Sequence, residues 1–115
     1  MAYKLTVRAG PKVRRSRHRD LDDALDALEA RGRELARDAP GEAVDLRYKR
    51  VEARDRIVAR LELAGPQRLV PSVRAGVDVH GDGSIQAYRG RVRRAAIDAA
   101  GGDAYVALRR ALSQR

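Results

Sequence analysis

The stretch from Val44 to Leu63, VDLRYKRVEARDRIVARLEL, decides the fold that the sequence predicts. In both halves of it, apolar residues take every second position and charged residues take most of the positions between them. Such a period of two is typical of strands that bury one face against a core and expose the other. We therefore predict a long β-hairpin at the centre of an antiparallel sheet.

The register of this hairpin follows from its loop and its cross-strand pairs. A two-residue turn at 52–53 would lack the Gly or Asn that such tight turns need. A second register would place Arg47 opposite Arg60, and like charges in that position repel. The third register has a four-residue loop at 53–56 and pairs Arg47 with Glu62, so we predict this one.

This register assigns each side chain of the hairpin to a face of the sheet. Tyr48 points toward the core, and Val51 pairs with Val58 to form a small apolar patch on the outer face. The charged residues of the outer face are Arg47, Lys49, Arg60 and Glu62. A mixed face of this kind is ordinary on the open side of an antiparallel sheet, but it would also suit docking of an anion or of a second protein.

The chain begins with another alternating stretch. Residues 3–9 alternate apolar and polar side chains, and Gly10 and Pro11 after them are a turn signal. Residues 12–19 are the densest basic run in the protein. They are either an edge strand returning from the turn, where cations deter edge-to-edge aggregation, or a mobile basic loop. We favour the edge strand.

Two amphipathic helices are predicted from spacing and capping. Asp20 is a good N-cap, and apolar residues recur at helical spacing from Leu21 to about Asp38. Asp103 is the corresponding cap of a final helix, in which Tyr105 lies on the apolar face. Each helix therefore has one face to bury.

A second hairpin is predicted between the helices. Residues 73–80 alternate strictly, and the chain returns over 85–92 after a Gly-Asp-Gly turn at 81–83. If the turn is a three-residue loop with its last Gly left-handed, Val79 faces Ile85 and the apolar face is continuous. A two-residue Asp-Gly turn would reverse the facing of the returning strand. We favour the three-residue loop.

These elements combine into an α+β fold. We expect residues 1–115 to form a single domain with a five- or six-stranded, mainly antiparallel sheet and two helices packed on one face. The expected order is ββαββββα, or βαββββα if the basic run is a loop. Residues 93–102 are expected to be a linker anchored by Ile97.

Composition limits the classes of function. Cysteine is absent, which excludes disulfides and thiol chemistry. No stretch has the length and hydropathy of a signal peptide or a membrane span, so we expect a cytoplasmic protein with no membrane partner.

The charge balance points to an acidic partner. A net charge of +9 favours contact with an acidic protein or non-specific contact with nucleic acid. Only three of the 25 basic residues are lysines, and a GC-rich genome produces the same bias toward arginine. The residues that we expect to contact an anion or a partner are Arg14, Arg15, Arg17, Arg47, Lys49 and Arg60.

Asp78, His80 and Asp82 are the one cluster in the sequence that resembles a reactive site. Alternation puts Asp78 and His80 on the same sheet face, and Asp82 lies in the adjoining turn. No further His or carboxylate is placed to complete a set of metal ligands, and turn chemistry accounts for these residue types. We therefore expect no catalytic residue, no metal and no cofactor.

Three hypotheses of function follow. We favour a non-enzymatic binding domain whose basic sheet face and 12–19 arm contact an acidic protein or nucleic acid. The second hypothesis is a self-associating structural protein, a homodimer formed through the face of Val51 and Val58 or through the cationic edge of the sheet. The third is a small enzyme that uses Asp78 and His80.

Overall fold

The computed structural model describes residues 3–41, 44–46, 49–65, 74–90, 95–99 and 102–113, with the backbone alone at 44–46 and 49. Two helices, eight strands and one short 3-10 turn lie within these ranges. In chain order they are β1 (Tyr3–Ala9), β2 (Lys12–His18), α1 (Leu21–Arg37), β3 (Val44–Leu46), β4 (Lys49–Val51), η1 (Ala53–Asp55), β5 (Ile57–Ala64), β6 (Arg74–His80), β7 (Ile85–Arg89), β8 (Ala95–Ile97) and α2 (Ala104–Ser113).

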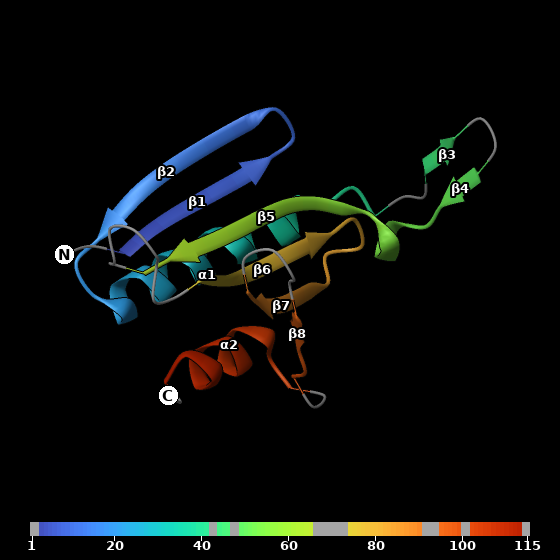
Figure 1. Ribbon diagram of the computed structural model, residues 1–115. Helices are drawn as coiled ribbons and strands as arrows, with labels where there is room; N and C mark the ends of the chain where they lie inside the picture. Colours follow the sequence, from blue (N-terminus) through green and yellow to red (C-terminus); the bar gives the residue numbers. More distant parts are fainter. Residues whose placement is uncertain are drawn as a thin grey trace.

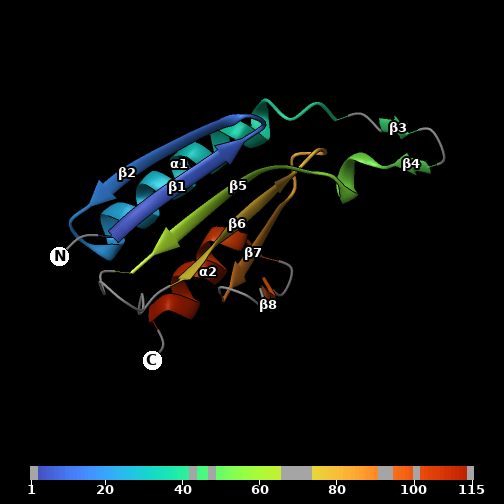
Figure 2. The same cartoon turned by 45° about the horizontal axis from the view of Figure 1, so that its top comes forward.

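Six of the strands form one antiparallel sheet in the order β2-β1-β5-β6-β7-β8 (Figure 1). Both helices lie behind this sheet in Figure 2, and their buried residues join the same apolar cluster as the strands. The helix-facing side chains include Leu61, Leu63, Val77 and Val79, all 0% exposed. The predicted α+β class is therefore confirmed, with two helices on one face of a six-stranded antiparallel sheet.

The predicted hairpin from Val44 to Leu63 is wrong. β3 and β4 pair only with each other, in a separate two-stranded ribbon that extends from the main sheet (Figure 1). β5 pairs instead with β1 and β6 and lies near the middle of the sheet. Val51 lies opposite Val44 in the ribbon, so its expected pair with Val58 is wrong. Arg47 and Tyr48 lie outside the described residues. The predicted loop at 53–56 contains the turn η1.

The pairing of β1 with β5 explains why the predicted hairpin of Val44–Leu63 does not form. It brings Leu5 opposite Leu63 and Val7 opposite Leu61, so two half-apolar strands match over six residue pairs. Central placement gives β5 a hydrogen-bonded neighbour on each side and buries Ala59, Leu61 and Leu63. Closing a longer loop costs little extra entropy, because that cost grows only logarithmically with length.

The first hairpin is confirmed, and its basic arm is a strand. β1 and β2 pair over seven residues, from Tyr3 opposite His18 to Ala9 opposite Lys12, across a two-residue loop. Gly10 opens this loop with a φ of 60°. A left-handed Gly followed by Pro is the type II′ turn, whose twist matches that of the flanking strands.

The turn between β6 and β7 is the predicted three-residue loop. Val79 lies opposite Ile85, and the amide of His80 donates to the carbonyl of Ser84 at 2.9 Å. Gly83 has a φ of 86°, which glycine adopts without steric cost. The alternative two-residue turn is therefore wrong.

The helices begin at their predicted caps. Asp20 Oδ1 accepts from the amide of Asp23 at 2.8 Å, and Asp103 Oδ1 accepts from the amide of Tyr105 at 2.7 Å. The expected linker at 93–102 contains a short edge strand, β8, in which the predicted anchor Ile97 packs against the core. Neither helix in the described part of the chain is both long and apolar enough to cross a membrane.

Candidate functional site

The charge of this protein is unevenly distributed along the sheet. Residues 3–19 comprise β1, the turn at 10–11, β2 and Arg19. They contain seven Lys or Arg residues and no Asp or Glu. We call this segment the cationic hairpin; its basic residues are Lys4, Arg8, Lys12, Arg14, Arg15, Arg17 and Arg19. Within the described part of the chain, none of the seven forms an ion pair.

The register of the hairpin places these cations on two faces. Arg17 lies opposite Lys4 and Arg15 lies opposite Thr6, so these side chains share the sheet face that no helix covers. Lys12 and Arg14 lie on the other face, beside α1. Every side chain of β2 from Lys12 to Arg17 is exposed.

The pair of Lys4 and Arg17 is unfavourable for the isolated fold. Opposed side chains in an antiparallel pair have Cβ atoms about 4.5–5.5 Å apart, and like charges at that spacing destabilise the sheet. The acidic residues that the described strands of the main sheet place on the same face are already bonded. Asp78 accepts from Arg60, and Glu62 accepts from Arg74 at 2.7 Å. The cationic hairpin thus has a charge that the described residues do not neutralise.

Three of the predicted partner-binding residues lie in this hairpin, and three do not. Arg14, Arg15 and Arg17 belong to β2, with Arg15 and Arg17 on the uncovered face. Arg47 lies outside the described residues. Lys49 belongs to β4 in the separate ribbon, where only its backbone is described.

Arg60, the sixth predicted residue, is held by the fold itself. Its guanidinium donates two hydrogen bonds to the carboxylate of Asp78, at 2.6 and 3.2 Å. It also lies over the ring of Tyr88, 5.8 Å from the centroid. The hydrogen bond to Asp78 raises the pKa of Arg60, so the residue stays charged, but its charge is used within the sheet.

Sequence reasoning missed Lys4 and Arg8, which lie beside Arg15 and Arg17 on the uncovered face. The signal was present, because alternation in β1 and the two-residue turn together fix which side chains are neighbours. Tyr88 lies on the uncovered face, opposite Gly76, as the three-residue turn predicts, yet it is only 2% exposed.

Two members of the cluster of Asp78, His80 and Asp82 are bonded to residues outside it. Asp78 is engaged with Arg60, and Asp82 Oδ1 accepts from the amide and the hydroxyl of Ser84 at 2.9 and 2.6 Å. The Ser84 hydroxyl is the main cause that lowers the pKa of Asp82. In the part of the chain that the structure describes, no three His, Cys, Asp or Glu side chains are grouped so as to hold a metal.

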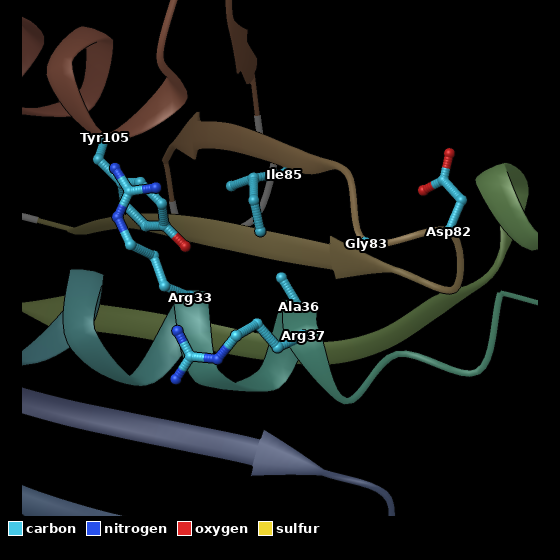
Figure 3. A pocket seen from close by; sticks show the side chains of 7 residues that line it. All are labelled: Arg33, Ala36, Arg37, Asp82, Gly83, Ile85 and Tyr105. Atoms are coloured by element: carbon cyan, nitrogen blue, oxygen red, sulfur yellow. The ribbon is translucent and has the colours of Figure 1, made fainter.

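A groove of about 460 Å³ lies between α1, α2 and the β6–β7 turn (Figure 3). Tyr105 reaches from α2 toward α1, and the guanidinium of Arg33 lies 4.9 Å from the centroid of its ring. Arg33 also bonds Glu29 at 3.0 Å and Asp103 at 2.8 Å, so its charge is neutralised. The residues that line the groove are Arg33, Ala36, Arg37, Asp82, Gly83, Ile85 and Tyr105.

Most polar groups of the groove take part in the packing of α2 against α1. Tyr105 is 3% exposed, and its hydroxyl is sealed from water with no hydrogen-bond partner among the described residues. Burial raises the pKa of Tyr105 to about 12. Because Arg33 and Asp82 are already bonded, Arg37 is the one charged side chain of the lining with no bond to another described residue. The cationic hairpin is the stronger candidate.

In comparisons with known proteins, no protein-family model, no curated protein and no solved structure matches this chain.

Proposed function

We propose that this protein is a non-enzymatic, cytoplasmic binding domain that holds an acidic protein segment on the cationic hairpin. One observation carries the proposal. Residues 3–19 have seven cations, two of them directly opposed across the strands, with no acidic residue among them. A partner that supplies carboxylates would relieve this repulsion, so binding and the relief of strain would act together.

An acidic protein segment suits the surface better than nucleic acid does. Proteins that hold single strands stack bases on exposed aromatic side chains. Tyr88 and Tyr105 are 2% and 3% exposed, and Tyr3 is half-buried on the helix side of the sheet. Among the described residues, the cationic hairpin therefore has no stacking platform. Binding of nucleic acid would rest on phosphate contacts alone.

Self-association through the basic edge is disfavoured by the same charges. Two copies of β2 paired edge to edge would bring arginines of one copy against arginines of the other. The alternative dimer surface of Val51 and Val58 depended on the hairpin register that proved wrong. Val58 packs against the core at the bulge between Ile57 and Ala59.

The test is binding of labelled poly-glutamate, with random single-stranded and double-stranded oligonucleotides as competitors, measured by fluorescence anisotropy over a range of salt. One variant replaces Lys4, Arg8, Arg15 and Arg17 with Gln. A control variant loses the same net charge elsewhere, at four exposed residues without an ion pair in the described chain, which are Arg37, Arg54, Arg89 and Arg110.

We expect the hairpin variant to lose at least about tenfold in affinity for poly-glutamate, and the control to lose less than about threefold. Equal losses in the two variants would mean that net charge alone attracts the polymer, and the proposal would be wrong. If oligonucleotides bind more tightly than poly-glutamate, nucleic acid is the partner. The slope of the logarithm of the binding constant against the logarithm of the salt concentration, measured for single strands, should then be smaller in magnitude by about 3 in the hairpin variant.

A further inference from the structure

β2 is an edge strand, and its backbone is open on one side. β1 is its only neighbour among the described strands, because β2 ends the sheet order. Ala9 and Lys12 flank a two-residue loop and therefore exchange both backbone hydrogen bonds. The ladder alternates from that pair, so the amides of Lys12, Arg14 and Ser16 face β1. The amides and carbonyls of Val13, Arg15 and Arg17 face outward.

This open edge has an unusual combination of features. Its seven residues are long enough to align a further strand, and their side chains are exposed almost throughout. Cations lie on both faces of β2, with Arg15 and Arg17 on the uncovered face and Lys12 and Arg14 on the helix face. A strand added beside β2 would place its own side chains directly opposite these cations.

We propose that the acidic partner binds as an extended strand that pairs with the open edge of β2 and continues the sheet beyond it. This inference rests on the proposed function, because it states how the cationic hairpin holds an acidic segment. Main-chain hydrogen bonds to Val13, Arg15 and Arg17 supply a part of the affinity that does not depend on charge. Carboxylates on both faces of the added strand supply the selectivity. Like-charge repulsion rejects a second copy of β2 from the same edge.

Amide hydrogen exchange measured by NMR tests the pairing residue by residue. The probe is a nine-residue peptide in which two glutamates alternate with one valine, so that acidic side chains occur on both faces. In the free protein, the amides of Val13, Arg15 and Arg17 should exchange quickly, while those of Lys12, Arg14 and Ser16 are protected by β1. Saturating peptide should slow the outward-facing set at least about tenfold and leave the other set unchanged.

Two variants at one position separate backbone pairing from charge. Arg15→Ala and Arg15→Pro remove the same cation, but only proline also removes an outward amide. Proline is tolerated on edge strands when its nitrogen faces solvent, and circular dichroism will show that the variant is folded. We expect Arg15→Ala to lower the affinity for the peptide moderately, and Arg15→Pro to lower it at least about tenfold further.

The peptide itself provides a second test on the unchanged protein. A version with an N-methyl group on every residue keeps every carboxylate but has no amide left to donate to β2, and it should bind at least about tenfold more weakly. If the peptide binds but slows none of the three amides, or if Ala and Pro act alike, strand addition is wrong while the proposed function stands. Charge-driven binding is strong at low salt, about 50 mM. If the peptide does not bind under that condition, the strand addition and the proposed function are both wrong.

Discussion

Gly32 and Tyr105 come from different helices and depend on each other. A Cβ atom built on Gly32 would overlap the hydroxyl of Tyr105 and would lie 3.1 Å from Tyr105 Cζ. Glycine within a helix costs about 1 kcal/mol relative to alanine, so α1 gives up stability of its own to admit the ring. The ring is in turn buried in the core cluster.

We expect Gly32→Ala to destabilise the protein by about 1–3 kcal/mol, although alanine is the better helix former, because overpacking outweighs the gain in propensity. Urea unfolding followed by circular dichroism measures this change. Adding Tyr105→Phe removes the clashing oxygen and should restore part of the loss. A stabilised Gly32→Ala variant would show that the two residues do not meet as described.

Tyr105 also makes stability depend on pH in the alkaline range. Its folded-state pKa is about 12, against an ordinary value of 10.0, because burial disfavours the phenolate. Between these two values the unfolded chain has released the proton and the folded chain has kept it. Stability should therefore fall as the pH rises from about 10 to about 12, by up to roughly 3 kcal/mol from this group.

Comparison of the parent with Tyr105→Phe isolates this contribution. At pH 8 the two proteins should differ by less than about 1 kcal/mol, since the hydroxyl has no partner among the described residues. At pH 11 the phenylalanine variant should be the more stable one in urea unfolding. Parallel decreases in both proteins would assign the alkaline loss to other groups.

At the scale of elements, Asp103 has two separate roles in placing α2. Its Oδ1 caps the amide of Tyr105 at 2.7 Å, and its Oδ2 accepts from Arg33 of α1 at 2.8 Å. The hydrogen bond from Arg33 is the main cause that lowers the pKa of Asp103. The start of one helix is thereby bonded to the middle of the other.

Substitution of Asp103 can separate the two roles. Asp103→Asn keeps a capping oxygen but loses the charge, and exposed ion pairs contribute little, so we expect a loss below about 1 kcal/mol. Asp103→Ala removes the cap as well and should cost about 1–2 kcal/mol. Thermal unfolding of the three proteins measures the difference. Equal losses for Asn and Ala would mean that the ion pair, not the cap, holds α2.

At the scale of the molecule, we expect the charge of the cationic hairpin to control self-association as well. β2 is an exposed edge strand of a kind that would otherwise pair with another copy, and Val13 on it is 39% exposed. We expect the parent to be monomeric at high concentration. Replacing Lys12, Arg14, Arg15 and Arg17 with Thr keeps β propensity but removes the repulsion, so this variant should self-associate in light scattering. A monomeric variant would mean that something other than charge protects the edge.

The features that follow from short stretches of sequence could be predicted well. Asp20 and Asp103 cap the helices as expected, and the turn at 81–83 has the expected length and glycine conformation. The candidate site was predicted in part. The 12–19 arm is a strand at the sheet edge, but its neighbours Lys4 and Arg8 were overlooked, and Arg60 is bonded to Asp78.

The sequence by itself determined which face β1, β5 and β6 bury, apart from the bulge between Ile57 and Ala59, because alternation with a period of two is a local property of the chain. The sequence also predicted the two short hairpins, but only the tertiary structure decided which strands lie beside β5. The alternation of Val44–Leu63 would fit a hairpin equally well, yet β5 pairs with β1 and β6 because the centre of a sheet buries more apolar surface than a local pair can. That same choice left β2 at the edge, with its arginines and its backbone facing outward.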